Sequence, residues 1–126
     1  MALNTQDTDE LVETIARLEP SFGGINLEDI AAPRCFEIER RLQERMNIPV
    51  FHDDQHGTAI VVSSALVNAL RFVKKGDPTI VINGAGSAGC AIANLILEMK
   101  IGKVILCDKD GILSEEMNLS DEQRRL

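Results

Sequence analysis

The pattern of apolar and polar positions predicts alternating helices and short strands along the whole chain. After Asp7, apolar side chains recur at the helical spacing of Leu11, Ile15 and Leu18. Asp7 and Glu10 have the spacing of a capping box with aspartate as the N-cap residue. We therefore expect a helix over residues 7–18, which ends before Pro20.

A second helical stripe follows Pro33, a residue type that is common in the first turn of a helix. Its apolar members are Cys35, Ile38, Leu42 and Met46. The charged residues between them are expected to face water: Glu37, Glu39, Arg40, Arg41 and Glu44. The stripe predicts that one face of this helix packs against a core.

Two short apolar segments each end in a pair of carboxylates. Residues 23–27 lead into Glu28 and Asp29, and residues 48–51 lead into Asp53 and Asp54. A long stretch with helical spacing follows Asp54 and ends near a predicted turn at residues 76–78. The pattern is typical of two strands, the second of which is followed directly by a helix.

The second half of the chain repeats the alternation. A strand is predicted over 79–82, a helix over 91–99 after a glycine-rich segment, and a strand over 103–107 that ends in Asp108. Ser120 and Gln123 have capping-box spacing near the end of the chain. This order predicts the α/β class, with a parallel sheet and flanking helices.

Composition narrows the range of partners and compartments. The chain has 126 residues, of which 44% are hydrophobic, and a net charge of −7, which argues against nucleic acid and anionic membranes as partners. Cys35, Cys90 and Cys107 form no C-x-x-C motif, so we expect reduced core thiols. No signal peptide or long uninterrupted apolar run is present, which predicts a cytoplasmic protein without a membrane contact.

The four carboxylates at the predicted strand ends are the first candidate site. Adjacent aspartates repel one another unless a cation, a helix N-terminus or hydrogen-bond donors compensate. Capping of the following helix by Asp54 is one explanation. The carboxyl ends of parallel strands lie on one edge of a sheet, so Glu28, Asp29, Asp53 and Asp54 are also expected to converge there, where Mg²⁺ or Mn²⁺ would be the preferred ligand.

The second candidate site is a G-x-G-x-x-G segment between a predicted strand and a predicted helix. Gly84 would permit a tight turn, Gly86 the approach of a pyrophosphate, and Gly89 close packing of helix and strand. Asp108 would bind the adenosine ribose, and its charge favours NAD over NADP, although Lys109 weakens the discrimination. The alternative is that the glycines serve packing alone. The expected dinucleotide contacts are Gly84, Gly86, Ser87, Ala88, Gly89, Cys90 and Asp108.

Three segments together resemble the bacterial malic enzymes. They are Phe22–Ile30 (FGGINLEDI), Phe51–Ala59 (FHDDQHGTA) and Asn83–Gly89 (NGAGSAG), which have the order and spacing of that family. The resemblance extends over nearly the entire chain.

The resemblance implies oxidative decarboxylation of L-malate to pyruvate and CO₂, with NAD or NADP and a divalent metal. It implies Glu28, Asp29 and Asp54 as the metal ligands and Asp53 as the catalytic acid beside the metal. It also implies a homo-oligomer, with a dimer expected, and a small-molecule substrate. In this interpretation, residues 1–52 end the substrate and metal domain, and residues 53–126 begin a Rossmann-type nucleotide domain.

The chain departs from the family pattern in its catalytic residues. The family's catalytic tyrosine and lysine would precede Met1, and the chain contains no tyrosine. None of its lysines matches the family's general base. We therefore expect an internal fragment that is inactive alone.

Three alternatives remain beside this interpretation. A malolactic enzyme of the same family would release lactate without net oxidation. A non-catalytic module that binds nucleotide or metal is the second. A zinc hydrolase is disfavoured, because the change from strand to helix between His52 and His56 should keep the two rings off a common face.

Overall fold

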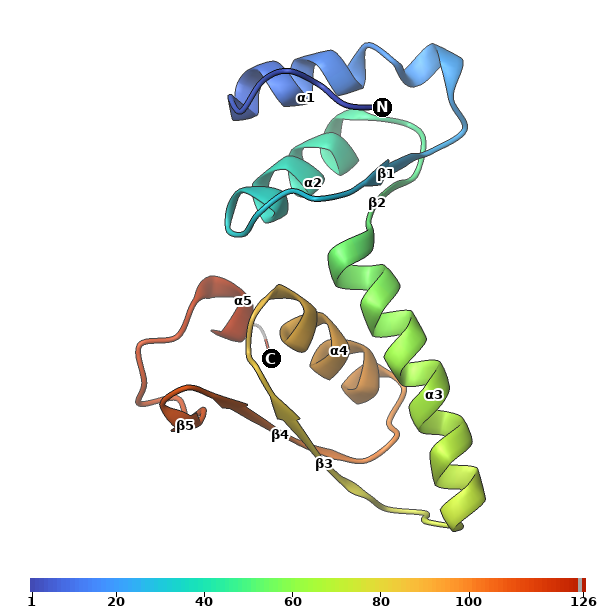
Figure 1. The fold of residues 1–126 in the computed structure, drawn as a ribbon, viewed down its shortest axis with the longest axis vertical. Helices are drawn as coiled ribbons and strands as arrows, with labels where there is room; N and C mark the ends of the chain where they lie inside the picture. The colour runs from blue at the N-terminus through green and yellow to red at the C-terminus, as the bar shows by residue number, and fades with distance from the viewer. Residues whose placement is uncertain (125) are drawn as a thin grey trace. The chain divides into compact units, whose positions relative to one another are not determined.

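The computed structural model describes residues 1–124 and 126, which form two compact units. The first is Met1–Asp53 and the second is Asp54–Leu126. Figure 1 labels the elements in chain order. The α/β class is confirmed.

The first unit contains two helices and a pair of parallel strands (Figure 1). Strand β1 pairs with strand β2 in a register that places Ile25 beside Val50 and Leu27 beside His52. Both strands therefore end at the same edge. The elements are α1 (Thr8–Ala16), the 3₁₀ turn η1 (Glu19–Ser21), β1 (Ile25–Leu27), α2 (Arg34–Arg45) and β2 (Val50–His52).

The core of the first unit lies between α1, α2 and the two strands. Ile38 and Leu42 of α2 are fully buried, beside Leu11 and Ile15 of α1. These are the positions that the helical spacing predicts, and the side chain of Asp7 accepts the expected N-cap hydrogen bond from the Glu10 amide at 2.8 Å. The prediction that Glu39 faces water is wrong, because Glu39 is only 7% exposed.

Ion pairs join α1 to α2 across the surface of this core. Arg41 lies 2.7 Å from Asp9, and Arg45 lies 2.6 Å from Glu13. Hydrogen bonds from Arg45 and then from Arg17 lower the pKa of Glu13 below its ordinary value. The two arginines therefore favour the ionised form of Glu13.

A single π-helical turn, η2 (Asp53–Gly57), connects β2 to the long helix of the second unit. The sequence predicts that a regular helix follows Asp54, whereas the α-helix begins only at Thr58 and has Gly57 as an N-cap without a side-chain hydrogen bond. The further elements are α3 (Thr58–Val73), β3 (Thr79–Asn83), α4 (Ser87–Glu98), β4 (Lys103–Asp108), β5 (Gly111–Ile112) and α5 (Asp121–Arg124).

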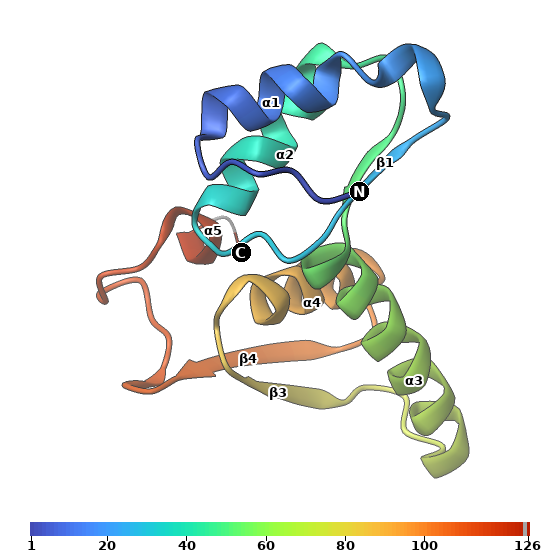
Figure 2. The ribbon, with the colours of Figure 1, turned by 45° about the horizontal axis from the view of Figure 1, so that its top comes forward.

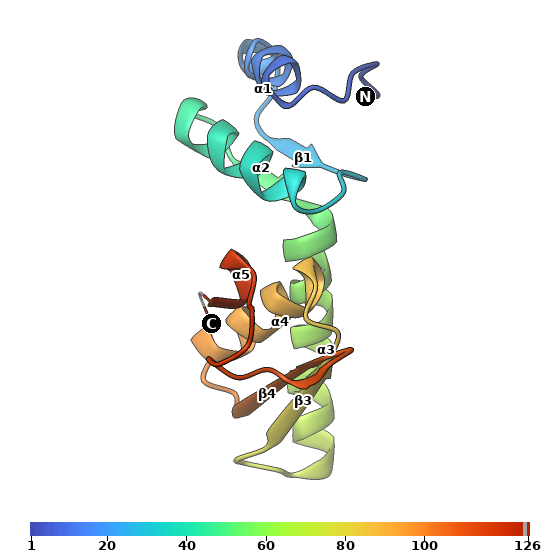
Figure 3. The same cartoon turned by 90° about the vertical axis from the view of Figure 1, so that its left-hand side faces the viewer.

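The sheet of the second unit has the strand order β3, β4, β5. Strands β3 and β4 are parallel, and α4 lies over one face of this pair (Figure 2). Helix α3 packs against α4, as the side view in Figure 3 also shows. The short antiparallel strand β5 was not predicted; it returns from β4 through a turn formed by Lys109 and Asp110.

Helix α3 is unusually apolar on its outer surface. Val61 and Val73 are 69% and 61% exposed, and Phe72 is 89% exposed. By length and composition alone, the helical segment Asp53–Val73 could cross a membrane, a test that core helices of soluble proteins also pass. One such helix is weak support for a membrane contact.

Candidate functional site

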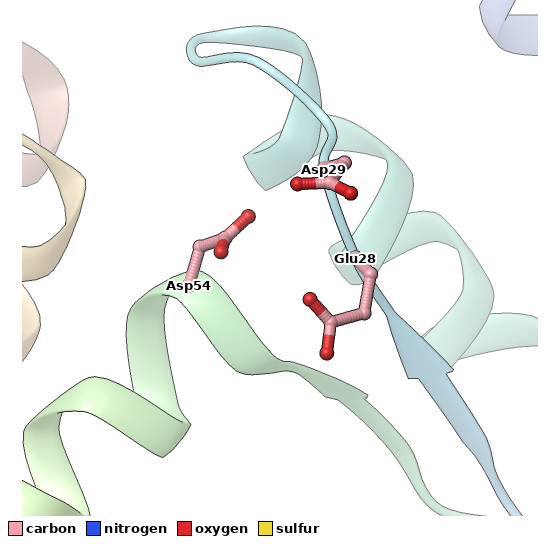
Figure 4. A group of neighbouring side chains, drawn as sticks. All are labelled: Glu28, Asp29 and Asp54. Carbon is pink, nitrogen blue, oxygen red and sulfur yellow. The ribbon is translucent and has the colours of Figure 1, made fainter.

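Three carboxylates gather where β1 and β2 end. Glu28 directly follows β1, and Asp54 lies two residues after β2. One carboxylate oxygen from each of Glu28, Asp29 and Asp54 lies within 4.8 Å of the other two. Figure 4 shows the three carboxylates directed toward a common space.

The local backbone explains why consecutive residues present their carboxylates together. Asp29 has a φ of 55°, in the left-handed region that is uncommon outside glycine but tolerated by aspartate. In a regular strand, Glu28 and Asp29 would point to opposite faces. The turn at Asp29 interrupts that alternation, and Asn26 of β1 donates a hydrogen bond to Glu28 Oε1 at 3.3 Å.

The donor set fits a hard divalent cation. All three side chains are exposed, and each offers oxygen ligands only. Oxygen atoms that bind Mg²⁺ lie about 2.0–2.1 Å from the ion, so two of them on opposite sides are at most about 4.2 Å apart. The three oxygens lie within 4.8 Å of one another, so small rotations of these exposed side chains would bring them onto one ion. Metal binding itself stays a prediction.

The other candidates on this segment lie outside the carboxylate group. Asp53 is half-buried in the π turn, next to Asp54 in sequence, but it is not a member of the group. His52 is buried at the end of β2, whereas His56 is half-buried in the turn. Among the described residues, the group of possible ligands contains carboxylates alone, and neither histidine belongs to it.

The glycine-rich segment forms a tight connection between β3 and α4. Gly84 has a φ of 120°, a conformation that other residues rarely adopt, and its amide donates to the Cys107 carbonyl at 2.8 Å. A Cβ atom at Gly89 would lie 1.8 Å from the Gly84 carbonyl oxygen. The turn at Gly84 and the close approach at Gly89 are therefore both structural facts, whereas contact with a dinucleotide stays a prediction.

Helix α4 begins at Ser87, with Gly86 in the N-cap position. The Cys90 amide donates to the Gly86 carbonyl at 2.9 Å, which closes the first helical turn. The amides of Ser87, Ala88 and Gly89 precede that bond, so they have no carbonyl partner within the helix. Such a group of N–H donors attracts anions, including phosphate. Cys90 is buried and points its thiol toward the Ala85 carbonyl at 3.5 Å.

Asp108 is the last residue of β4 and is half-buried. One of its carboxylate oxygens accepts a hydrogen bond from the Lys109 amide at 2.8 Å. This bond ties the carboxylate to the turn that leads into β5. The role of Asp108 in ribose binding stays a prediction.

Two further residues act near these sites and were missed by the sequence analysis. Asn26 contacts Glu28, and an amide at the end of a strand gave no signal of this role. Gln123 donates to the Ala85 carbonyl at 3.0 Å. Its capping-box spacing predicted α5 but not this long-range contact.

Comparisons with known proteins agree on one family. Residues 2–43 match the family model for the malic enzyme N-terminal domain. The chain is 56% identical over 117 residues to a bifunctional malic/malolactic enzyme of Bacillus subtilis, a match that covers 91% of this chain and 28% of the relative. It is 55% identical over 115 residues to an NADP-dependent malic enzyme of Haemophilus influenzae, covering 88% of this chain and 15% of that protein.

A solved structure gives the same result. The crystal structure of an NAD-dependent malic enzyme from Thermotoga maritima aligns with a TM-score of 0.88 and 44% identity over 99% of this chain. The alignment covers 34% of that enzyme, so the chain spans about a third or less of the length of each of these relatives. By sequence and by fold, this chain is similar to a part of the malic enzymes.

Proposed function

We propose that the chain serves in a malic enzyme, which oxidatively decarboxylates L-malate to pyruvate and CO₂ with NAD or NADP and a divalent cation. The observation that carries the proposal is the group formed by Glu28, Asp29 and Asp54 in a chain that shares half of its residues with malic enzymes. We further propose Mg²⁺ or Mn²⁺ as the ion, a homodimer, and a cytoplasmic location.

The proposed metal ligands are Glu28, Asp29 and Asp54, whose oxygens lie within 4.8 Å of one another and would reach one ion after small side-chain rotations. When bound, the cation would polarise the malate hydroxyl and stabilise the negative charge that develops on oxygen. These exposed side chains would hold the ion where substrate oxygens could complete its coordination. Asp53, adjacent to Asp54 in sequence, is proposed as the acid beside the metal.

The proposed dinucleotide site is the β3–α4 connection. Its free helical amides at Ser87, Ala88 and Gly89 would donate to the pyrophosphate, and Gly86 would allow the approach of the backbone. Asp108 at the end of β4 would accept from the ribose hydroxyls and disfavour a 2′-phosphate. Residues 53–126 would thus belong to the nucleotide domain, and residues 1–52 to the substrate domain. A dinucleotide held there would supply the nicotinamide as the hydride acceptor.

The chain alone is proposed to be inactive. The reaction needs a base for the hydroxyl proton and an acid for the enol, each worth roughly 10²–10⁴-fold in rate. In the family these roles belong to a lysine and a tyrosine, and this chain has no tyrosine. A longer protein that contains the chain would supply both.

Malate-dependent NADH formation with Mn²⁺ tests this proposal. The 126-residue chain and a longer protein that contains it are compared at equal concentration. We expect NADH and pyruvate from the longer protein and no turnover by the chain. Comparable rates would show that the chain holds its own base and acid, whereas lactate without NADH would identify the malolactic alternative. Failure of the longer protein to consume malate would contradict the proposed activity.

A further inference from the structure

We infer that Gln123 is a positioning residue for the glycine-rich loop, an inference that rests on the proposed dinucleotide site. Its side-chain amide donates to the Ala85 carbonyl at 3.0 Å. Ala85 is the second residue of the loop and is 4% exposed. Gln123 lies 38 positions away in sequence, so the bond ties α5 to the loop.

The hydrogen bond from Gln123 is one of the contacts that hold the three successive carbonyls of the loop, those of Gly84, Ala85 and Gly86. The Gly84 carbonyl faces Gly89, and the Gly86 carbonyl accepts from the Cys90 amide at 2.9 Å. Between them, the Ala85 carbonyl accepts from Gln123 and lies 3.5 Å from the Cys90 thiol. A thiol is a weak donor, so Gln123 supplies the stronger of these two bonds.

This orientation matters for an anionic ligand. Rotation of the Ala85–Gly86 peptide would turn a carbonyl dipole toward the space in front of the α4 N-terminus, where it would repel a pyrophosphate. By holding the Ala85 carbonyl, Gln123 disfavours the rotated state and keeps the loop ready for phosphate.

Gln123 is itself held by α5. Its side-chain Oε1 accepts a hydrogen bond from the backbone amide of Ser120 at 2.8 Å. The backbone amide of Gln123 donates in return to Ser120 Oγ at 3.3 Å. These two bonds are a capping box, and glutamate can replace glutamine in such a box. Gln123→Glu therefore keeps the acceptor for Ser120 but removes the donor to Ala85. Ser120→Ala removes one capping bond and keeps that donor, which makes it the matched control.

The test measures NADH binding to the 126-residue chain by fluorescence, together with hydrogen exchange at the Cys90 amide without ligand. Loss of one hydrogen bond predicts an NADH dissociation constant roughly threefold to tenfold higher for Gln123→Glu, with a smaller change for Ser120→Ala. The new carboxylate also repels the anionic ligand, so the exchange rate without ligand is the readout that reports on the loop itself. We also expect faster exchange at Cys90 in Gln123→Glu, because that amide is bonded to the loop.

The other outcomes contradict either the positioning role of Gln123 or the proposed dinucleotide site. An unchanged dissociation constant in Gln123→Glu, or an equal rise in both variants, would overturn the positioning role. If the unmodified chain does not bind NADH, the proposed dinucleotide site fails in this chain. The exchange rate at Cys90 then decides the positioning role alone, since faster exchange in Gln123→Glu supports it and an unchanged rate overturns it.

Discussion

Gly89→Ala should destabilise the second unit by crowding the glycine-rich loop. The added Cβ would lie 1.8 Å from the Gly84 carbonyl oxygen and 3.0 Å from the carbonyl carbon. Both atoms are backbone, so no side-chain rotation relieves the clash. To reach the shortest ordinary contact of 3.4 Å, the loop or the start of α4 must move by more than an ångström.

The size of the effect follows from overpacking of a closely packed interior. Such insertions cost about 1–3 kcal/mol, and for a unit of this size each kcal/mol lowers the melting temperature by about 4–8 °C. Gly84 limits the relaxation further, because its φ of 120° and its hydrogen bond to Cys107 fix the other side of the turn. We therefore expect a melting temperature at least several degrees lower.

Thermal unfolding followed by circular dichroism measures this change. Gly76→Ala is the matched control, because it makes the same substitution in the same unit at a position with no atom within 4 Å of the new Cβ. We expect the free energy of unfolding of the control to lie within about 0.5 kcal/mol of that of the unmodified chain. Equal melting temperatures for Gly89→Ala and Gly76→Ala would show that the loop moves freely and would refute the close-packing argument.

Two further predictions concern the charged residues. Asp108→Asn should reduce the ratio of NAD⁺ affinity to NADP⁺ affinity, because it removes the charge that repels a 2′-phosphate. If titration shows that the unmodified protein binds NADP⁺ more tightly than NAD⁺, this role of Asp108 is contradicted. The stabilising contribution of Glu13, whose pKa is lowered first by Arg45 and then by Arg17, is complete above the unfolded-state pKa of 4.5 and is lost as the pH falls through the lower folded-state pKa. Glu13→Gln should therefore weaken the dependence of the melting temperature on acid pH, and parallel curves for the two proteins would argue against the ion pair's contribution.

Sequence alone was sufficient for elements with strong local signals. The stripe of Ile38 and Leu42 located the buried face of α2, and Asp7 located the start of α1, because spacing and capping act within one helix. The strand ends were also predictable, since a parallel pair brings both ends to one edge. That logic predicts Glu28 near Asp54, and the structure brings their carboxylates together.

Features that depend on backbone detail or distant contacts were not predictable. The π turn at Asp53–Gly57 has no sequence signature, and within it Asp54 joins the carboxylate group whereas Asp53 does not. Burial of Glu39 depends on neighbours that helical periodicity does not report. The Asp110–Gly111 pair is a known turn signal, but its short β5 strand was too brief for the apolar pattern to reveal.

Mn²⁺ binding to the chain tests the carboxylate site most directly. Electron paramagnetic resonance would measure the concentration of free Mn²⁺ during titration of the unmodified chain, of Asp54→Asn and of Asp53→Asn. Asp54 belongs to the group of convergent oxygens and Asp53 does not, so the two variants differ in one position while removing the same charge. We predict one Mn²⁺ bound per chain, an affinity at least about tenfold weaker for Asp54→Asn, and a smaller loss for Asp53→Asn. Unchanged affinity in Asp54→Asn, or no binding to the unmodified chain, would contradict the assignment of Glu28, Asp29 and Asp54 as metal ligands.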